Sequence, residues 1–252
     1  DTSSYGRAFW VGLWNTVIVA VIGIVLATVL GFVMGIARLS QNWLIAKIAS
    51  LYVELVRNVP LLLQLFIWYF AVLKSLPPPR QSHVVPGGGF LNVRGLYFAK
   101  PIPEAGFNAV LLAMLAGLVA TVAIGLWARR RRIVTGQQFP VFWSGVGLIG
   151  VLPTLLFLLI GRPLGFEYPE LKGFNFEGGI VFQPEFMALL VGLVFYTGGF
   201  IAENVRSGIL GVPKGQKEAS KALGLSNGQM LRLVVIPQAM RIIIPPLTSQ
   251  FL

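Results

Sequence analysis

Long apolar runs constrain this chain more than any other feature. Crossing a lipid bilayer takes roughly 20 residues of helix at about 1.5 Å per residue. Five stretches meet that length or nearly so: about 8–37, 59–73 with an upstream extension through Tyr52 and Val53, 107–127, 140–160 and 186–202. Only 12% of the residues are charged, against roughly 25% in a soluble domain. The sequence therefore predicts an all-α fold, a polytopic membrane helical bundle.

The charges are arranged as a membrane protein requires. The net charge of +11 invites a nucleic-acid interpretation, but the Lys and Arg residues lie between the apolar runs. If Arg129–Arg132 form a cytoplasmic turn, alternation also places residues 38–58 and those after Glu203 inside. The inside regions then carry a net charge of +10 and the outside regions +1, which the positive-inside rule favours. The first residues of the chain are predicted to lie outside.

Several kinds of chemistry are excluded. The chain has no cysteine, so it can form neither disulfides nor thiolate metal sites. His83 is the single histidine and lies in a Pro/Gly-rich loop, where we interpret it as solvated. No phosphate-binding G-x-x-x-x-G-K-[ST] pattern is present. We expect no cofactor, no metal and no enzyme activity in this chain itself.

The two outer loops and the small residues of the first apolar run are predicted to have structural roles only. The outer loop 74–105 is rich in Pro and Gly and is predicted to be a connector without regular structure. The second outer loop, 162–185, is interpreted as solvated. Small residues recur every fourth position along the first apolar run, and this spacing predicts close packing inside the bundle; they are Gly23, Ala27, Gly31 and Gly35.

A few polar side chains fall within or near membrane depth, where lipid offers them no partner. They are candidates either for a substrate path or for hydrogen bonds inside the bundle, and the sequence leaves both open. The candidates are Asn15, Thr16, Gln64, Tyr196, Thr197 and Glu203.

The sequence becomes polar after the fifth apolar run. Residues 203–224 are polar and compatible with a helix. Pro213 suits a helix start, and Gly224 can take the left-handed conformation that ends one. A second apolar segment runs to Ile236 and is predicted to break at Pro237. A membrane protein without chemistry of its own could use such a short exposed helix to dock on a cytoplasmic partner.

This segment resembles the cytoplasmic loop of bacterial ABC importer permeases. That loop reads Glu-Ala-Ala, three residues, Gly, nine residues, then Ile-x-Leu-Pro. The chain has the same spacing, with three conservative departures, at Glu218, Ala219, Ser220, Gly224, Val234, Ile236 and Pro237. The flanking residues and the string from Glu54 to Gln64 are similar to the polar-amino-acid branch. The resemblance covers about two thirds of the chain.

The resemblance implies the transmembrane domain of a type I ABC importer, in a multi-pass protein of the bacterial inner (cytoplasmic) membrane. We expect one permease domain over residues 1–252, with a cytoplasmic coupling loop at about 204–237. The hairpin at about 107–160 falls outside the core pattern and resembles the general L-amino acid permease subgroup. A last core helix would start within 245–252 and be cut off.

The resemblance also implies a role for the loop and a set of partners. The partners are cytoplasmic ABC ATPase subunits, a second permease subunit that is identical or related, an external substrate-binding protein and the lipid bilayer. Glu218 is expected to pair with a basic group, either on the ATPase or among Lys214, Lys217 and Lys221. The coupling residues are Pro213, Gly215, Gln216, Glu218, Ala219, Ser220, Gly224, Val234, Ile236 and Pro237.

Two other classes of function are compared with the importer. A secondary transporter driven by an ion gradient would show internal repeats or buried charges near the bilayer centre, and no clear repeat is present. A scaffold subunit without a transport path would not need a cytoplasmic loop with this spacing. Which amino acids would be carried is left open.

Overall fold

The structure is a computed structural model that describes residues 5–251. The chain divides into two compact units. The first contains the described residues up to 82, 91–96 and those from 182 onward, and the second contains 83–90 and 97–181. Each unit is described by itself.

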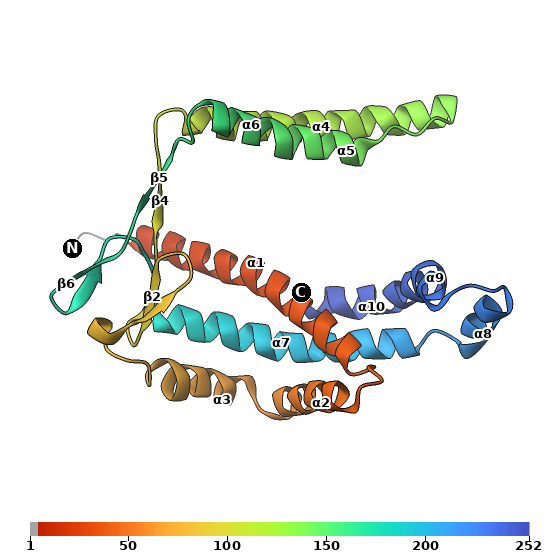
Figure 1. Cartoon of the computed structure of the whole chain (residues 1–252), viewed down its shortest axis with the longest axis horizontal. Coiled ribbons are helices and arrows are strands. Elements are labelled where there is room, and N and C mark those ends of the chain that lie inside the picture. The colour runs from red at the N-terminus through yellow and green to blue at the C-terminus, as the bar shows by residue number, and fades with distance from the viewer. Residues whose placement is uncertain (1–4, 252) are drawn as a thin grey trace. The chain divides into compact units, whose positions relative to one another are not determined.

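The first unit is a bundle of helices around α7, Pro184–Leu210. Helices α1, α2, α3 and α10 all pack against α7 (Figure 1). The helical segments of this unit are α1 Tyr5–Ala37, α2 Trp43–Asn58, α3 Leu61–Phe66, η1 Ile67–Leu73, η2 Pro79–Gln81, α8 Lys214–Ala222, α9 Asn227–Met230, η4 Leu231–Val235 and α10 Ile236–Gln250.

Small residues allow α1 to lie close to α7. Gly23, Ala27, Gly31 and Gly35 are all buried along one face of α1. A Cβ added at Gly35 would lie 2.7 Å from the carbonyl oxygen of Ala202, closer than real Cβ atoms approach. The predicted role of these residues in internal packing is confirmed.

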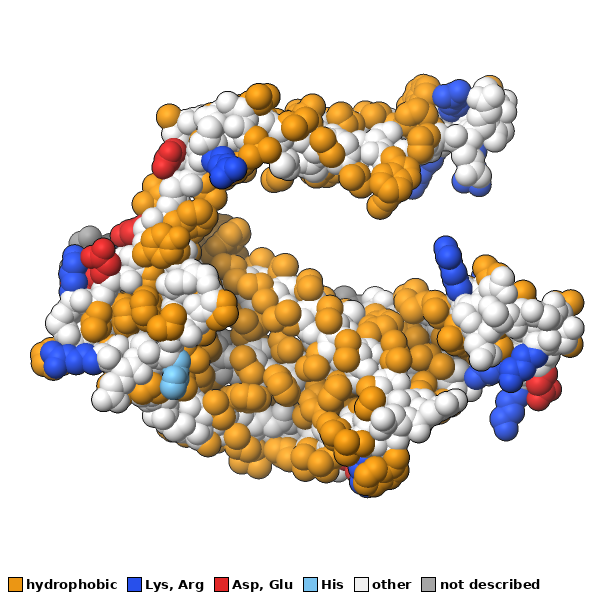
Figure 2. Space-filling view, viewed as in Figure 1, with side chains coloured by type: hydrophobic (Ala, Val, Ile, Leu, Met, Phe, Trp, Pro, Cys, Tyr) orange, Lys and Arg blue, Asp and Glu red, His pale blue; other side chains and the backbone are white. Residues whose placement is uncertain are grey.

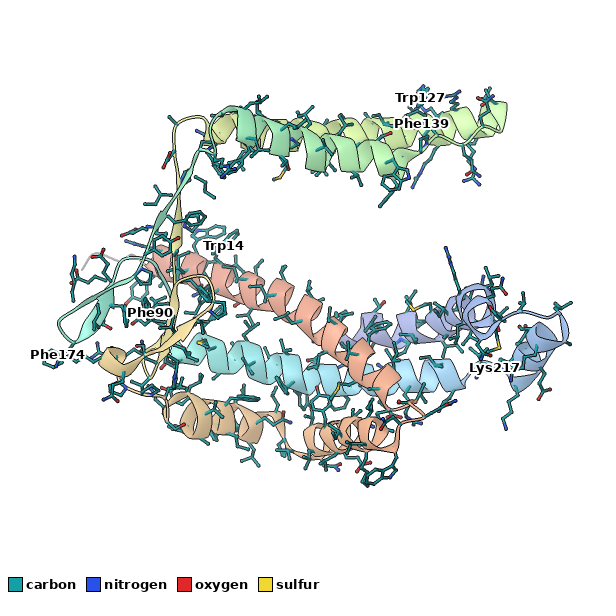
Figure 3. The ribbon with its side chains drawn as sticks, in the orientation of Figure 1. Trp14, Phe90, Trp127, Phe139, Phe174 and Lys217 are labelled. Carbon is teal, nitrogen blue, oxygen red and sulfur yellow. The ribbon has the colours of Figure 1, made fainter. Side chains whose placement is uncertain are left out.

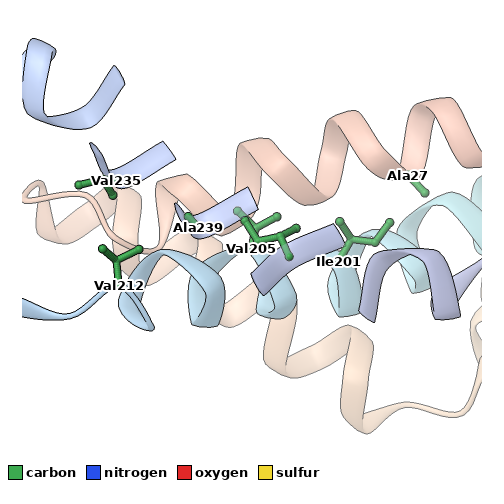
Figure 4. Packing of buried hydrophobic residues seen from close by; sticks show 7 residues of the cluster. Ala27, Ile201, Val205, Val212, Val235 and Ala239 are labelled. Atoms are coloured by element: carbon green, nitrogen blue, oxygen red, sulfur yellow. The ribbon is translucent and has the colours of Figure 1, made fainter. Parts of the chain in front are cut away.

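A cluster of buried aliphatic side chains holds the α8 end of the first unit together (Figure 4). It links α1 and α7 to Val212, in the connection between α7 and α8, and to η4 and α10. Its members are Ala27, Ile201, Val205, Val212, Val235, Ala239 and Ile243. Because Val212 and Val235 belong to it, the segment that follows α7 is fixed to the bundle.

The second apolar stretch is bent. The pair formed by α2 and the following α3–η1 segment changes direction by 109° at Val59 and Pro60. Pro60 restricts the backbone before it to extended conformations, which favours a helix end there. The Gln64 amide nitrogen donates to the carbonyl oxygens of Val56 and Val59, at 2.8 Å each, and so caps the end of α2. The predicted upstream extension through Tyr52 and Val53 therefore lies in a separate helix, joined to the rest of the stretch by a sharp bend.

Helix α7 and the last helix are longer than predicted. Helix α7 continues past Ala202 to Leu210, because Ala202 and Val205 are buried in the bundle. The predicted break at Pro237 is also wrong. A wide π-helical turn precedes it, in which the Ile236 amide donates to the carbonyl of Leu231, and such a turn accommodates a residue without N–H.

Helix α10 runs from Ile236 to Gln250 and so occupies most of the range in which a further core helix was expected to start. That further helix stays a prediction. Leu252 lies outside the described residues.

The second unit carries a helical hairpin at the predicted position. Its helices are α4 Phe107–Thr135, α5 Val141–Gly145, η3 Val146–Val151 and α6 Leu152–Leu159. The four arginines, predicted to form the turn, lie instead in the last turns of α4. Arginine is a good helix former, and the helix ends at Gly136, which has a φ of 71° and donates to the carbonyl of Arg132.

The outer loops contain short strands, which corrects the prediction of a connector without regular structure. They are β1 His83–Val85, β2 Gly89–Asn92, β3 Gly95–Phe98, β4 Lys100–Pro103, β5 Leu164–Glu167, β6 Glu170–Lys172, β7 Asn175–Glu177 and β8 Ile180–Phe182. The order β1-β2-β3-β8 forms one sheet. Strand β4 pairs antiparallel with β5, Lys100 opposite Glu167, and β6 pairs with β7, Glu170 opposite Glu177.

Aromatic side chains pack among the strands of the second unit. The rings of Phe90 and Phe176 stack with centroids 4.6 Å apart, and Tyr97 lies 5.1 Å from Phe176. The Tyr97 hydroxyl also lies 3.2 Å from the Asn175 side-chain oxygen. These contacts explain how strands of only three or four residues persist.

Among the described residues, five helices are long and apolar enough to cross a membrane, or six if the bent pair counts as one span. The five are 5–37, 107–135, 141–159, 184–210 and 227–250. Hydrophobic side chains cover the helices of each unit, and Lys and Arg gather toward helix ends (Figure 2). The predicted class, a helical polytopic membrane protein, is confirmed.

Candidate functional site

The segment that the sequence singled out forms a short helix, α8. It begins directly after Pro213, whose extended backbone (φ −55°, ψ 139°) leads into the first turn. The predicted helix start and end both agree with the structure, since α8 spans Lys214–Ala222 and Gly224 follows with a φ of 75°. The Gly224 amide donates to the carbonyl of Lys221 at 2.9 Å, and the Leu225 amide donates to that of Ser220 at 3.1 Å. This is the left-handed termination that favours glycine.

One face of α8 is fixed to the bundle. Ser220 is only 3% exposed, and its hydroxyl donates to the carbonyl of Gln216 at 2.6 Å. Gln216 in turn accepts a hydrogen bond from the Gln238 side chain, at 3.4 Å, which joins α8 to α10. Helix α8 also packs against η4. The helix is therefore held as a rigid projection from the bundle.

The opposite face of α8 is open. Gly215, Glu218, Ala219 and Ala222 are all exposed and recur at the three- and four-residue spacing of a helix face. A Cβ added at Gly215 would meet nothing within 4 Å. None of the four ion pairs found within residues 5–251 involves Glu218, although three lysines share its helix. Figure 3 shows Lys217 projecting from this end of the first unit.

The remaining residues of the family pattern lie in the returning helix. Val234 is half-buried in η4, while Ile236 and Pro237 begin α10 with exposed side chains. Their neighbours Val235 and Ala239 are buried in the aliphatic cluster. The pattern therefore marks the places where the segment joins the bundle as well as its exposed helix.

A second polar feature lies where α7 approaches its end. Glu203 forms ion pairs with Arg38, at the end of α1, and with Arg206, one turn further along α7, the latter at 2.6 Å. The Arg57 guanidinium, in the last turn of α2, lies 3.7 Å from the same carboxylate and above the ring of Phe200. One carboxylate thus holds three guanidinium groups from three helical segments. We call these four residues the Glu203 cluster.

The other polar candidates do not converge on one place. Asn15 and Thr16 are exposed on α1, and the Thr16 hydroxyl donates to the carbonyl of Gly12. Tyr196 packs against Phe200, with ring centroids 5.0 Å apart. Gln64, described above, is buried at the bend after α2. The structure therefore brings none of these side chains into a common path.

Thr197 lines a cavity of about 180 Å³ between α1, α7 and α10. Gln250, near the end of α10, lines the same cavity and was not singled out from the sequence. Sequence reasoning also missed Arg38 and Arg57 as partners of Glu203, and Tyr52, whose hydroxyl donates to the carbonyl of Phe195 at 2.7 Å. These partners lie far apart in sequence, so no local pattern could reveal them.

The apolar helices of the two units define a polytopic helical membrane protein. Residues 109–252 match the family described as binding-protein-dependent transport system inner membrane component. The chain belongs to this family and is a multi-pass component of the bacterial inner membrane, as predicted.

The relatives are named as amino acid permeases. The chain is 54% identical, over 250 residues, to the general L-amino acid transport system permease protein AapQ of Rhizobium johnstonii, covering 99% of this chain and 62% of that protein. It is 36% identical, over 248 residues, to the glutamate/glutamine/aspartate/asparagine transport system permease protein BztB of Rhodobacter capsulatus, covering 86% of this chain and 58% of that protein. The chain thus spans about three fifths of the length of these relatives.

One solved structure is also similar. The crystal structure of an amino acid ABC transporter with histidines aligns with 98% of this chain and 67% of that chain, at 19% sequence identity and a TM-score of 0.48.

Proposed function

We propose that this chain is the membrane-spanning permease subunit of an ATP-driven importer of polar or general L-amino acids. Membership of the inner-membrane component family and the names of its relatives support this function. The chain contributes the membrane path, while ATP hydrolysis belongs to a partner subunit. Both compact units serve this single permease domain, the hairpin being an addition to its core.

The coupling step is assigned to α8. The observation that carries it is the open face of α8, on which Glu218 has no ion-pair partner among the described residues while Ser220 and Val212 fix the opposite side. A carboxylate left free beside three lysines is available to a basic group on a cytoplasmic ATPase. Gly215 and Ala219 have no bulky side chain on that face, so a partner surface can approach the helix backbone closely.

Movement of the docked ATPase would reach the membrane helices through the aliphatic cluster. Val212 and Val235 bracket α8 in sequence and pack with Val205 and Ile243 of the long helices. Because a packed cluster is stiff, a displacement of α8 moves α7 and α10 with it. An external binding protein and a second permease subunit, identical or related, complete the proposed complex.

Transport and ATPase measurements on the whole complex test this proposal. Vesicles containing the complete permease pair, ATPases and binding protein are compared with and without ATP. We expect amino acid accumulation only with ATP. Accumulation that needs no ATP and collapses with an ionophore would instead identify a secondary transporter, and no accumulation in either condition would favour a scaffold.

Charge reversal tests the role of α8 separately. Glu218→Arg is expected to lower ATPase retention and amino acid uptake at least roughly tenfold, since close charge pairs at interfaces contribute on the order of 1.5 kcal/mol or more. Glu170→Arg makes the same charge change at an exposed position of β6 and should retain the ATPase. If Glu218→Arg keeps both retention and uptake, the coupling role is wrong although the permease function stands.

A further inference from the structure

The end of the hairpin carries four guanidinium groups and no acidic residue. Arg129, Arg130, Arg131 and Arg132 occupy the last turns of α4, and residues 107–160 contain neither Asp nor Glu. Glu104 precedes the start of α4, and the arginines lie at its other end. Helix α4 has 29 residues, so at 1.5 Å per residue Glu104 and the arginines are roughly 40 Å apart. At that distance charges are screened by salt.

Two of these arginines line a groove. A cavity of about 300 Å³ lies between the end of α4 and the start of α5 and is lined by Gly125, Ala128, Arg129, Arg132, Gln138, Phe139 and Val141. Its size is at the lower end of the range for small-ligand sites, about 300–1,000 Å³. Arg129 and Arg132 lie one helical turn apart, so both guanidinium groups can serve one ligand.

Neighbouring side chains leave those two arginines available. Arg131 donates to the Gln137 side-chain oxygen at 2.8 Å and lies 5.3 Å above the ring of Trp127. The four ion pairs found in residues 5–251 include neither Arg129 nor Arg132. The groove is thus basic, and within residues 5–251 no carboxylate forms an ion pair with either of its two arginines.

The groove lies at the depth of lipid headgroups. A crossing of roughly 20 residues that starts at Phe107 ends at Leu126, so Trp127 and the arginines follow directly. Trp127 and Phe139 pack edge to face with ring centroids 5.4 Å apart at this end of the hairpin (Figure 3), and Trp143 lies in the first turns of α5. Such aromatic residues mark the boundary between hydrocarbon and water.

We propose that this groove binds the phosphate of an anionic phospholipid headgroup, with Arg129 and Arg132 as its ligands. Guanidinium groups donate to phosphate oxygens in a fixed fork, and basic pockets between membrane helices suit such headgroups. The exposed apolar side chains nearest the groove, on α4 and on α5 with the start of η3, lie beside the acyl chains of the same lipid. The site needs only the membrane insertion of the hairpin, so it goes beyond the transport function and does not depend on it.

Lipid titration of the full chain tests the site. The detergent-solubilised protein is titrated with phosphatidylglycerol, and the bound lipids are counted by native mass spectrometry. Arg129→Gln with Arg132→Gln is expected to weaken the tightest site roughly 30-fold, which is about 2 kcal/mol at 1.4 kcal/mol per tenfold. Arg130→Gln with Arg131→Gln removes the same charge outside the groove and should weaken it less than about threefold.

Titrations with phosphatidylcholine and with inorganic phosphate identify the ligand. Phosphatidylcholine is expected to bind without preference, and inorganic phosphate should not displace phosphatidylglycerol. Equal losses in the two double variants, or none in either, would overturn the site. Displacement by inorganic phosphate would assign it to a free anion.

Discussion

Glu203 of α7 and Arg38 at the end of α1 form an ion pair across 165 positions of the sequence. The side chains are only 24% and 13% exposed, so water screens the pair less than it would at an open surface. Arg206 and Arg57 share the same carboxylate. The pair therefore joins the end of the first helix to the helix that leads into α8, close to the proposed coupling segment.

Replacing Glu203 by Gln is expected to destabilise the bundle. The change leaves three guanidinium groups close together without a counter-charge. We expect a loss of about 1–3 kcal/mol, between the small value of exposed ion pairs and the larger cost of breaking a buried one. The measurement is thermal unfolding of the detergent-solubilised full chain. Glu218→Gln, at an exposed carboxylate without an ion pair, is the control and should leave the midpoint unchanged; equal shifts in both would contradict the assignment.

Gly35→Ala is expected to separate α1 from α7. The added methyl would lie 2.7 Å from the Ala202 carbonyl oxygen and 2.8 Å from the Val205 Cβ, and overpacking of this kind costs about 1–3 kcal/mol. Gly12→Ala is the matched control, because a Cβ there would meet nothing within 4 Å. Unfolding midpoints should fall for Gly35→Ala and stay or rise for Gly12→Ala. A shared response would mean that glycine flexibility, not close packing, determines the effect.

Local sequence signals predicted much of this architecture. The four-residue spacing from Gly23 to Gly35 identified the packed face of α1, because side chains at that spacing share one side of a helix. Pro213 and Gly224 bounded α8 correctly, because each restricts or permits one backbone conformation. The hairpin followed from apolar length alone.

Other features needed the folded chain. The Glu203 cluster forms only when α1, α2 and α7 pack together and bring Arg38, Arg57 and Glu203 into contact. No local sequence pattern therefore predicts it. Pro237 predicts a helix break from sequence, but tertiary packing of Val235 and Ala239 keeps the helix continuous through a π-helical turn. The strands have only three or four residues each and lie in loops rich in Pro and Gly, so no sequence pattern indicates them, and they depend on aromatic contacts between distant segments.

Gln64 was a candidate for the substrate path, and its position makes a second role testable. Its amide nitrogen satisfies two carbonyls at the end of α2, so Gln64→Leu leaves both without a partner in a buried place. The expected cost is about 1–3 kcal/mol, measured as a lower unfolding midpoint. Gln137→Leu, exposed beyond the end of α4, should change little. If Gln64→Leu keeps the midpoint but lowers amino acid uptake, the path role is the correct one.

Gly224 provides the sharpest test of how α8 is terminated. Its φ of 75° costs a residue with a side chain about 1–2 kcal/mol, so Gly224→Ala should loosen the end of α8 without reaching the core. Hydrogen exchange of the amides of residues 216–225 is expected to accelerate several-fold, while those of α7 keep their protection. Gly224→Pro should act more strongly, since it also removes the amide that donates to Lys221.

Gly215→Ala is the control within the same helix. The position has ordinary helical backbone and open space around its Cα, and alanine is the better helix former by about 1 kcal/mol. Exchange in α8 should therefore slow or stay the same. Should Gly224→Ala also leave exchange unchanged, the left-handed residue would not limit the helix, and the rigidity of α8 would have to come from its contacts with the bundle, at Ser220 and Gln216.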